Sequence, residues 1–350
     1  MVIAGLGTAA PPWVYPQSDV WAAVQRAPQF PNLSPRSRAI LRKVLTGNNG
    51  IRTRHLALEN LDEAFDLSPD VLHRRFAHHA PLLAVQAAAK ALEDAQIKPA
   101  EIDGIIVSTC TGYLCPGLTS YVAERLGLRL DVTAFDLVGQ GCGAALPNFR
   151  AAQGLLGTGC DRVLSICVEV CSAAFYLDDD PGVLISACLF GDGAGAAVLA
   201  NHANRNLRLE LKACYSLHQP QDRESLRFAH KDGLLRNVLL PDVPRLAGEA
   251  VKRLLDQALE AAGLRQTEIT TWLVHPGGRD VLSAVKQRAG LSDSDLRFSA
   301  GVLEDFGNVS SASLFFVLQR ALAGAAPRGH WWMTSFGAGF SVHGALWHAS

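Results

Sequence analysis

Residues 91–102 have the sequence Ala-Leu-Glu-Asp-Ala-Gln-Ile-Lys-Pro-Ala-Glu-Ile, and residues 258–269 repeat the pattern as Ala-Leu-Glu-Ala-Ala-Gly-Leu-Arg-Gln-Thr-Glu-Ile, 167 positions later. In each copy a helix-forming segment is followed by an apolar segment that predicts a strand and ends in a loop with glycine. A repeat of this kind indicates two structurally similar halves. Because helices and strands alternate in both, the sequence predicts an α/β fold whose strand-end loops face one shared crevice.

We place the first half at residues 1–200 and the second at residues 201–350. The polar stretch 201–245 is expected to be an irregular connection into the second half, and residues 17–54 are expected to be helical. The glycines of Phe-Gly-Asp-Gly-Ala-Gly-Ala, residues 190–196, lie between apolar runs with no helix and distal acid after them. They are therefore better explained by close strand packing than by dinucleotide binding.

The composition limits the class of protein. The chain has 350 residues, 49% of them hydrophobic and 19% charged, which is typical of a soluble protein with a large core. A formal net charge of −1 argues against nucleic-acid binding by phosphate neutralisation. No apolar run reaches about 18 residues, so we expect no transmembrane segment. The eight cysteines form no CxxC pair and no signal peptide precedes them, which indicates reduced thiols, no metal site and a cytoplasmic enzyme.

Residues 136–147, Asp-Leu-Val-Gly-Gln-Gly-Cys-Gly-Ala-Ala-Leu-Pro, predict a strand, a tight turn and the start of a helix. The turn places Cys142 near the helix N-terminus, where free N–H groups and the helix dipole favour an anion and would lower the thiol pKa. Flanking glycines would let a thioester approach the sulfur closely. Cys142 is thus a candidate nucleophile. The alternative is a buried structural cysteine in a glycine-rich turn.

A nucleophilic cysteine needs a base or a cation near it, and the second half offers two polar residues at expected strand ends. His275 follows the apolar run 271–274 and precedes Pro-Gly-Gly, so its imidazole would project into the crevice. Adding the repeat of 167 to Cys142 gives position 309, next to Asn308, in another glycine turn followed by small residues. Taken singly, His275 could be a structural histidine and Asn308 a helix cap.

Five motifs together are more specific than any one of these residues. They are Val138-Gly-Gln-Gly-Cys142-Gly-Ala-Ala145, Leu189-Phe190-Gly-Asp-Gly-Ala194, Val274-His275-Pro-Gly-Gly278, Gly307-Asn308-Val-Ser-Ser-Ala-Ser313 and Ser335-Phe336-Gly-Ala-Gly-Phe340. In content and order they resemble the type III polyketide synthases, the chalcone and stilbene synthase-like family of the thiolase superfamily. The resemblance spreads over most of the chain.

The resemblance implies a thiolase-like, five-layer αβαβα fold and a homodimer in which the loop near Cys115 reaches toward the partner's cavity. It also implies a catalytic triad of Cys142, His275 and Asn308. An imidazolium at His275 would stabilise the Cys142 thiolate, which takes an acyl group from an acyl-CoA starter. His275 and Asn308 would then stabilise the enolate formed by decarboxylation of malonyl-CoA, and this enolate would extend the chain before ring closure. Coenzyme A thioesters would be substrates, with no permanently bound cofactor.

The resemblance also assigns cavity and coenzyme A residues. Phe190 matches a gatekeeper phenylalanine, whereas the second gatekeeper position falls near Asn237. Ala174 stands where chalcone synthases have a pocket threonine, and Ser186 stands for a pocket glycine. The remaining substrate-facing positions are Cys110, Cys115 and Ser310. A basic cluster between residues 36 and 54 could hold coenzyme A phosphates, with Arg36 and Arg42 as the candidates, although a solvated helix face is the alternative.

Smaller side chains at the Ala174 and Asn237 positions predict an extended pocket that would favour a fatty acyl-CoA starter and an alkylpyrone or alkylresorcinol product. Two other functions are compatible with parts of the pattern. A 3-ketoacyl carrier-protein synthase III would also use Cys, His and Asn, but it usually has His-Gln-Ala-Asn where this chain has His275-Pro-Gly-Gly. A catalytically silent scaffold subunit is disfavoured because all three polar residues are present.

Overall fold

The computed structural model describes residues 1–202, 209–231 and 233–350. Its central feature is a mixed sheet of nine strands in the order β11-β12-β13-β8-β1-β7-β6-β4-β5. The first-half strands are β1 (Val2–Ala9), β4 (Gly104–Ser108), β5 (Thr133–Leu137), β6 (Arg162–Glu169) and β7 (Gly193–Ala200). The second-half strands are β8 (Leu209–His218), β11 (Ile269–Val274), β12 (Gly329–Gly337) and β13 (Ser341–Ala349). Two short antiparallel pairs are β2 (Val14–Pro16) with β3 (Thr53–His55) and β9 (Leu226–Lys231) with β10 (Leu234–Leu239).

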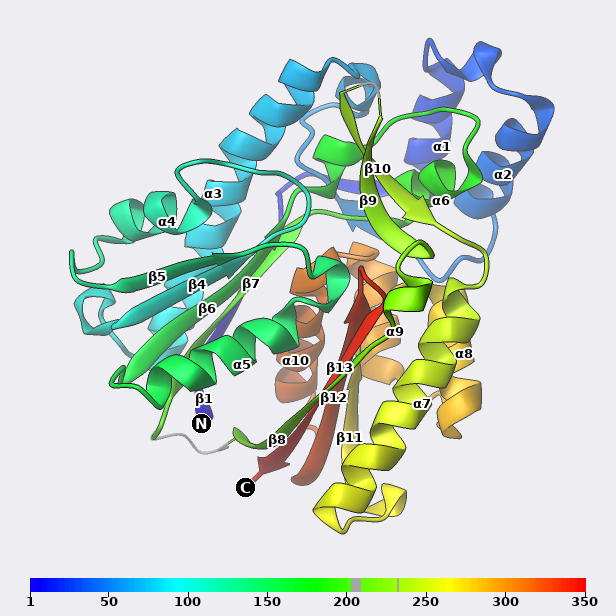
Figure 1. Ribbon diagram of the computed structural model, residues 1–350. Helices are drawn as coiled ribbons and strands as arrows, with labels where there is room; N and C mark the ends of the chain where they lie inside the picture. Colours follow the sequence, from blue (N-terminus) through cyan, green and yellow to red (C-terminus); the bar gives the residue numbers. More distant parts are fainter. Residues whose placement is uncertain (203–208, 232) are drawn as a thin grey trace.

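The helices lie in three layers around the two sets of strands (Figure 1). The outer layer of the first half contains α3 (Pro69–Ala95) and α4 (Leu118–Leu126), and the middle layer contains α5 (Ala145–Leu156) and α10 (Ser313–Ala323). The outer layer of the second half contains α7 (Val243–Ala262) and α8 (Arg279–Ala289). The other helices are α1 (Gln17–Arg26), α2 (Pro35–Thr46), α6 (Pro181–Leu189) and α9 (Arg297–Phe306). The predicted αβαβα arrangement of two similar halves is confirmed.

The two sets of strands are joined at one point. Strand β1 pairs along its length with β7, but at Val2 it also pairs with Glu210 of β8. The two predicted sheets therefore form one continuous sheet in this structure. The predicted boundary at residue 200 falls at the end of β7, and as a domain division it stays a prediction.

The 167-residue repeat corresponds to repeated local structure. Helix α3 ends at Ala95 and α7 ends at Ala262, and each is followed by one residue in the left-handed conformation. A short 3₁₀ turn then begins, in which the Glu101 carboxylate accepts the backbone N–H of Lys98 at 2.9 Å. In the second half the Glu268 carboxylate accepts the backbone N–H of Arg265, also at 2.9 Å. The strands β4 and β11 follow directly.

Two expectations about local structure were wrong. The polar stretch 201–245 contains strands β8, β9 and β10 in its described part, and residues 17–54 contain two separate helices and a short strand. Strand β8 was missed because only one of its faces is buried, so Leu209 and Leu211 alternate with the charged Glu210 and Lys212. That alternation of period two is itself a strand signal.

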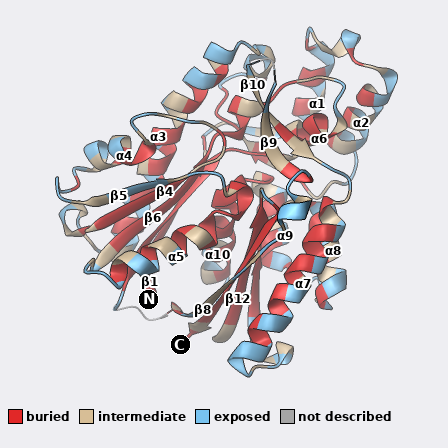
Figure 2. Ribbon diagram, in the orientation of Figure 1, coloured by how far each residue is buried: buried red, intermediate tan, exposed pale blue. Residues whose placement is uncertain are grey.

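The core follows the strands and the inner faces of the helices, while the outer faces of α7 and α8 are exposed (Figure 2). The glycines in residues 190–196 serve close packing, as predicted. A Cβ on Gly195 in β7 would lie 2.2 Å from the Cβ of Phe315, because α10 packs directly against this strand. In the described residues no helix is long and apolar enough to cross a membrane.

Candidate active site

Cys142 lies in a turn between β5 and α5, as the sequence predicts. A 3₁₀ turn, Gly141–Gly143, leads into α5, and Gly141 has a φ of 54°. A Cβ on Gly141 would lie 2.9 Å from the backbone nitrogen of Ala338, in the turn between β12 and β13. The Ser335 hydroxyl donates to the Gly143 carbonyl at 3.0 Å. The glycines are therefore needed because the second half approaches the nucleophile turn closely.

The Cys142 thiol is buried, and its sulfur lies 3.3 Å from the Ser310 hydroxyl oxygen. Burial raises the pKa of Cys142 to about 12, although the Ser310 hydrogen bond lowers it in part. The expectation of a lowered thiol pKa was therefore wrong. The physical reason is that the sulfur packs in an apolar cluster with Cys171, Cys188 and Phe190, where loss of hydration outweighs the nearby N–H groups.

His275 directly follows β11, as predicted, and its backbone N–H donates to the Thr334 carbonyl at 2.9 Å. The imidazole is 1% exposed and packs edge-on against Phe336, with ring centroids 5.1 Å apart. Burial lowers the pKa of His275 to about 3. Its buried Nδ1 atom has no hydrogen-bond partner among the described residues. The resting site thus holds a neutral imidazole with a ring nitrogen free for a substrate or a proton.

Asn308 does not follow a strand, in contrast to the prediction. It follows α9 and Gly307, which has a φ of 70°. The backbone of Asn308 nevertheless forms a parallel bridge with Phe190, which gives it the pairing of a strand end. Its side-chain oxygen accepts the Ser310 N–H at 2.9 Å, and its amide nitrogen donates to the Gly277 carbonyl at 3.2 Å. The carboxamide is fixed at both ends.

Ser310 connects two of the three predicted catalytic residues, Cys142 and Asn308. Its hydroxyl contacts the Cys142 sulfur, and its N–H is bound by the Asn308 side chain. Asn308 in turn binds the carbonyl of Gly277, two residues after His275. Ser310 adopts a φ of 47°, which is uncommon for a residue with a side chain. The structure therefore brings loops from both halves to one place, as the sequence predicts.

Glu169 is the polar residue of this site that sequence reasoning missed. It ends β6, is fully buried, and accepts hydrogen bonds from the Ser311 hydroxyl at 2.5 Å and the Thr111 hydroxyl at 2.9 Å. Its carboxylate also lies 3.3 Å from the Ser310 hydroxyl and from the Cys110 sulfur. Burial raises the pKa of Glu169. An acid at the end of an otherwise apolar strand was the signal that could have found it.

Other predicted cavity residues fall into two groups. Cys110 joins the Glu169 network, since its sulfur also lies 3.4 Å from the Ser310 hydroxyl. Asn237 and Ser186 form a second group, because the Asn237 amide donates to the Ser186 hydroxyl at 3.1 Å. That hydroxyl donates to the Gly182 carbonyl at 2.7 Å. Both side chains are buried.

A cavity of about 680 Å³ opens beside the nucleophile turn. It lies between the β9–β10 hairpin, the first turns of α3 and the loop at residues 109–113, and it reaches Cys110 and Gly141. Its apolar lining includes Leu72, Phe76, Phe228, Leu234 and Leu235. Ala173 lines it, but Ala174, Ser186 and Asn237 are not among its lining residues. A pocket that extends past Ala174 stays a prediction.

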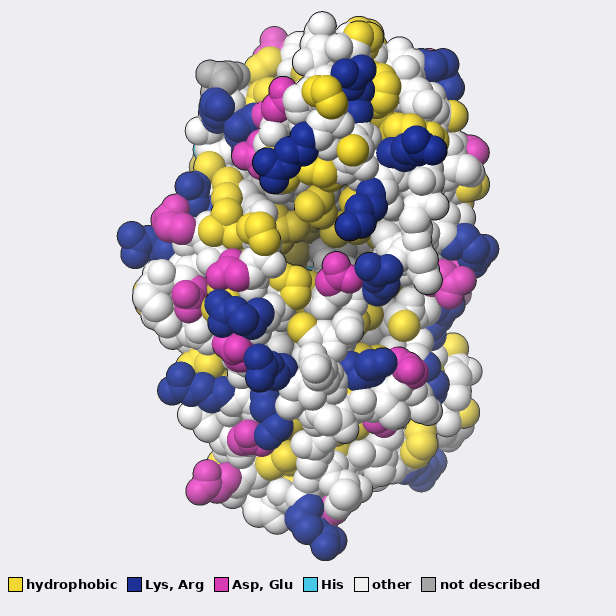
Figure 3. Space-filling model, turned by 90° about the vertical axis from the view of Figure 1, so that its right-hand side faces the viewer, with side chains coloured by type: hydrophobic (Ala, Val, Ile, Leu, Met, Phe, Trp, Pro, Cys, Tyr) yellow, Lys and Arg dark blue, Asp and Glu magenta, His cyan; other side chains and the backbone are white. Residues whose placement is uncertain are grey.

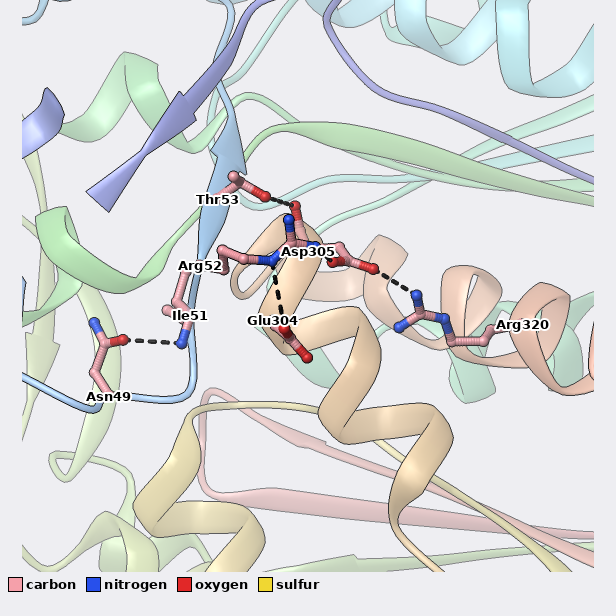
Figure 4. Close-up of polar contacts among 7 residues, drawn as sticks. All are labelled: Asn49, Ile51, Arg52, Thr53, Glu304, Asp305 and Arg320. Carbon is pink, nitrogen blue, oxygen red and sulfur yellow. Dashed lines mark hydrogen bonds and ion pairs between the residues drawn. The ribbon is translucent and has the colours of Figure 1, made fainter. Parts of the chain in front are cut away.

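The basic cluster between residues 36 and 54 is divided in the structure. Arg36 and Arg42 are exposed on α2. The side of the molecule on which α2 lies has Lys and Arg side chains around a hollow (Figure 3). Arg52 instead pairs with Glu304 and Asp305 at the end of α9 (Figure 4). Arg54 is buried. The α2 residues and Arg52 therefore face solvent, but Arg52 is engaged in ion pairs with acidic residues.

Comparisons with known proteins agree with this geometry. A family model for FAE1/type III polyketide synthase-like proteins matches residues 30–257, and one for the C-terminal domain of chalcone and stilbene synthases matches residues 217–349. The chain belongs to the type III polyketide synthases. The main fold and function predictions are therefore confirmed, and the chain is an acyltransferase-type enzyme of a family that uses coenzyme A thioesters.

Individual relatives cover nearly the whole chain. A 1,3,6,8-tetrahydroxynaphthalene synthase of Streptomyces peucetius subsp. caesius is 32% identical over 98% of this chain and 92% of its own length. A 3,5-dihydroxyphenylacetyl-CoA synthase of Streptomyces toyocaensis is 30% identical over 91% of this chain and 82% of its own. The crystal structure of PKS-I from the brown alga Ectocarpus siliculosus superimposes with a TM-score of 0.91 at 26% identity and covers 100% of this chain and 98% of that one.

Proposed function

We propose that Cys142 is the acyl carrier of this synthase and that His275 receives its proton. The Cys142 thiolate attacks the carbonyl carbon of an acyl-CoA starter, the bond to the coenzyme A sulfur breaks, and the coenzyme A thiolate leaves with a proton from His275. The observation that carries the proposal is the chain of contacts from Cys142 through Ser310 and Asn308 to the carbonyl of Gly277, two residues after His275. Because the resting thiol and imidazole are both neutral, the proton moves when substrate binds.

His275 and Asn308 act on malonyl-CoA in the next step. Loss of carbon dioxide breaks the bond to the malonyl carboxylate and leaves the electron pair as an enolate on the thioester oxygen. Two N–H donors aimed at that oxygen stabilise it in a site that excludes water. The enolate carbon then attacks the acyl-Cys142 carbonyl and releases the thiolate, so the chain grows by two carbons on coenzyme A.

Coenzyme A enters from the α2 face in this proposal, with Arg36 and Arg42 binding its phosphates. Both residues are exposed on α2. Charge-assisted bonds from arginine suit phosphate oxygens. Phe190, at the end of α6 and in the same apolar cluster as Cys142, would lie where the thioester arm reaches the sulfur.

The enzyme is a homodimer in this proposal. Strand β5 is an edge strand whose residues are largely exposed, and an open strand edge needs a cover. Large hydrophobic side chains are exposed on and beside it, namely Tyr113, Leu130, Phe135 and Val138. The loop with the exposed Cys115 belongs to the same region. Eight free cysteines agree with the proposed cytoplasmic location, because reduced thiols persist there.

The starter is a fatty acyl-CoA and the product an alkylpyrone or alkylresorcinol. The largely apolar cavity of about 680 Å³, which reaches Gly141 next to Cys142, supports this choice, since an alkyl chain gains about 0.8 kcal/mol for each buried CH₂ group. A relative from Mycobacterium tuberculosis, 29% identical to this chain, is named α-pyrone synthesis polyketide synthase-like Pks18.

The test is to incubate the purified enzyme with malonyl-CoA and starters from C4 to C16, together with an aromatic acyl-CoA, and to identify products by mass spectrometry. We expect kcat/KM to rise with chain length. A preference for the aromatic or the shortest starter would reject the long-chain proposal while leaving the roles of the triad intact. Repeating the series with Ala174→Phe asks whether the alkyl chain passes that position.

A further inference from the structure

Arg54 is a buried charged residue that takes no part in the proposed acyl transfer or decarboxylation. It lies on β3 and is 1% exposed. Its Nη1 group donates to the carbonyls of Ala187 and Phe190 at 2.7 and 2.8 Å, and its Nε group donates to the Gln17 side-chain oxygen at 3.1 Å. None of these described hydrogen bonds goes to a carboxylate. Burial lowers the pKa of Arg54 to about 10, so the group remains a buried cation at neutral pH.

The buried Asp192 carboxylate favours the Arg54 charge electrostatically, but no hydrogen bond between the two groups is present among the described contacts. A buried cation without a directly bonded carboxylate costs stability, and an apolar residue of similar volume could fill the same space. Its hydrogen bonds have a geometry that an apolar residue would not supply. The Phe190 carbonyl that Arg54 binds belongs to the peptide group whose N–H is on Gly191. That N–H donates to the Asn308 carbonyl at 3.0 Å. Because a peptide group is planar, fixing the carbonyl of Phe190 also fixes the direction of the Gly191 N–H.

The side chain of Arg54 also contacts the residue before Asn308. A Cβ on Gly307 would lie 3.1 Å from the Cγ of Arg54 and 2.6 Å from the Leu189 carbonyl oxygen. The Leu189 carbonyl accepts the Asn308 N–H at 2.9 Å. Arg54 therefore acts on the backbone of Asn308 at two points. It binds the Phe190 carbonyl, whose peptide group bonds to the Asn308 carbonyl, and it packs against Gly307, the residue before Asn308.

The residues before Arg54 hold the same helix end (Figure 4). The Thr53 hydroxyl donates to the Asp305 carbonyl, and the Arg52 N–H donates to the Glu304 carbonyl, both at 2.8 Å. The Asp305 carboxylate bridges Arg52 and Arg320, each at 2.5 Å. Residues 52 and 53 are therefore attached to the last turn of α9 at consecutive positions. Arg54, the next residue, is buried and packs against Gly307, which precedes Asn308.

We propose that Arg54 is a positioning residue that sets the direction of the Asn308 carboxamide through the Phe190–Gly191 peptide and Gly307. This inference rests on the proposed role of Asn308 in decarboxylation. Removing the guanidinium frees the peptide group and lets Asn308 shift relative to the malonyl thioester oxygen. Acyl transfer to Cys142 does not use the Asn308 donor. Loss of Arg54 therefore slows decarboxylation and leaves loading nearly unchanged.

The test compares two rates in Arg54→Met, which keeps the length of the side chain but removes the donors and the charge. Decarboxylation of malonyl-CoA is followed by carbon dioxide release, and single-turnover loading of Cys142 is followed by intact-protein mass. We expect decarboxylation to fall by a factor of about 10 to 10², the size of effect that a small misplacement of a reacting group produces. Loading should change by less than about threefold, which also reports that the variant is folded.

The matched control is Arg75→Met. Arg75 is also a buried arginine that donates to two backbone carbonyls, those of Ser172 and Glu63, at 2.7 and 2.8 Å. We expect Arg75→Met to lower the melting temperature as Arg54→Met does but to leave the ratio of the two rates unchanged. An equal change in the ratio of decarboxylation to loading in both variants would overturn the proposal, because it would show that Arg54 only supports the fold, as Arg75 does.

A double-mutant cycle separates this proposal from the proposed role of Asn308. In an Asn308→Ala background, Arg54→Met should slow decarboxylation no further, because the group that it positions is absent. Additive effects would overturn the positioning role. Unchanged decarboxylation in Asn308→Ala alone would instead reject the role of Asn308. If Arg54→Met does not fold, Arg54→Lys carries the same test, since an ammonium keeps the charge but lacks the fixed fork of donors.

Discussion

The turn at Cys142 and the turn at Asn308–Ser310 are equivalent in the two halves, and they differ in what surrounds them. Each is a 3₁₀ turn that leads into one of the two central helices, α5 or α10. The Cys142 turn is lined by glycines and an apolar cluster. The Asn308 turn is lined by polar groups, with Ser310 and Ser311 bonded to the buried Glu169. The same 3₁₀ turn, present in both halves, thus carries a buried nucleophile in the first half and a hydrogen-bonded Asn308 carboxamide in the second.

We expect the largest effect on acyl-enzyme formation when the nucleophile is removed from its turn. Cys142→Ala should reduce acyl-enzyme formation below detection, because no other group of the turn can form the thioester. After loading with an acyl-CoA, peptide mapping of the native enzyme should place the added mass on Cys142. An acyl group found on Cys110, Cys171 or Cys188 would assign the carrier to a different thiol.

The second turn is tested by Asn308→Ala. Decarboxylation of malonyl-CoA should fall by a factor on the order of 10² to 10³, the usual cost of removing one oxyanion donor. Loading of Cys142 should persist, since the thiol and the imidazole of His275 that carry this step are both retained. The two rates, measured on the same preparation, check this. Equal losses of both would mean that the Asn308 side chain only supports the fold, through its bonds to Ser310 and Gly277.

The two neutral groups predict the pH dependence of the free enzyme. The pKa of Cys142 is raised to about 12 and that of His275 is lowered to about 3, so both shifts disfavour a resting thiolate–imidazolium pair. The thiolate is the reactive species toward iodoacetamide. Its fraction, and with it the alkylation rate of Cys142, should rise about tenfold per pH unit between about pH 6 and pH 9. The measurement is peptide-resolved alkylation, with Cys142→Ala as the control for other thiols such as the exposed Cys115.

A rate that stays level across this range would contradict the prediction. It would show that an ion pair exists before substrate binds, as the resemblance alone implies. The difference matters because a neutral resting thiol is protected from oxidation and alkylation until an acyl-CoA enters.

The sequence predicted the frame of the site better than its electrostatics. The repeat at residues 91–102 and 258–269 predicted two similar halves, and the glycines around Cys142 predicted the turn, because both depend on local backbone requirements. The pKa of Cys142 was predicted with the wrong sign, since burial depends on which distant side chains pack around the sulfur. Glu169 was missed for the same reason. The acid at the end of an apolar strand was a signal for a buried polar site, but its hydroxyl partners Thr111 and Ser311 come from distant segments.

The positions of pocket residues also depend on tertiary contacts. Asn237 was assigned to the second gatekeeper position, and Ser186 was assigned to the place of a pocket glycine. In the structure they bind each other, which no pattern within either segment shows. Arg36 and Arg54 belonged to one basic cluster in the sequence, yet one is exposed on α2 and the other is buried behind Phe190.

The smallest expected effect concerns the caps that the two halves share. Glu101→Gln and Glu268→Gln replace carboxylates that accept a backbone N–H at 2.9 Å in equivalent turns. Each carboxylate also has an exposed ion pair, Glu101 with Arg162 and Glu268 with Arg265. Exposed pairs contribute little, so the shared cap should dominate and both variants should lower Tm by similar amounts, no more than about 2 °C each. Because the turns lie far from the catalytic loops, loading and decarboxylation should stay at their native rates. Differential scanning fluorimetry of the two variants and of the double variant checks this, and the two shifts should add. A clearly larger shift in one half would mean that the repeated turns, although alike in geometry, carry unequal shares of the stability of the fold.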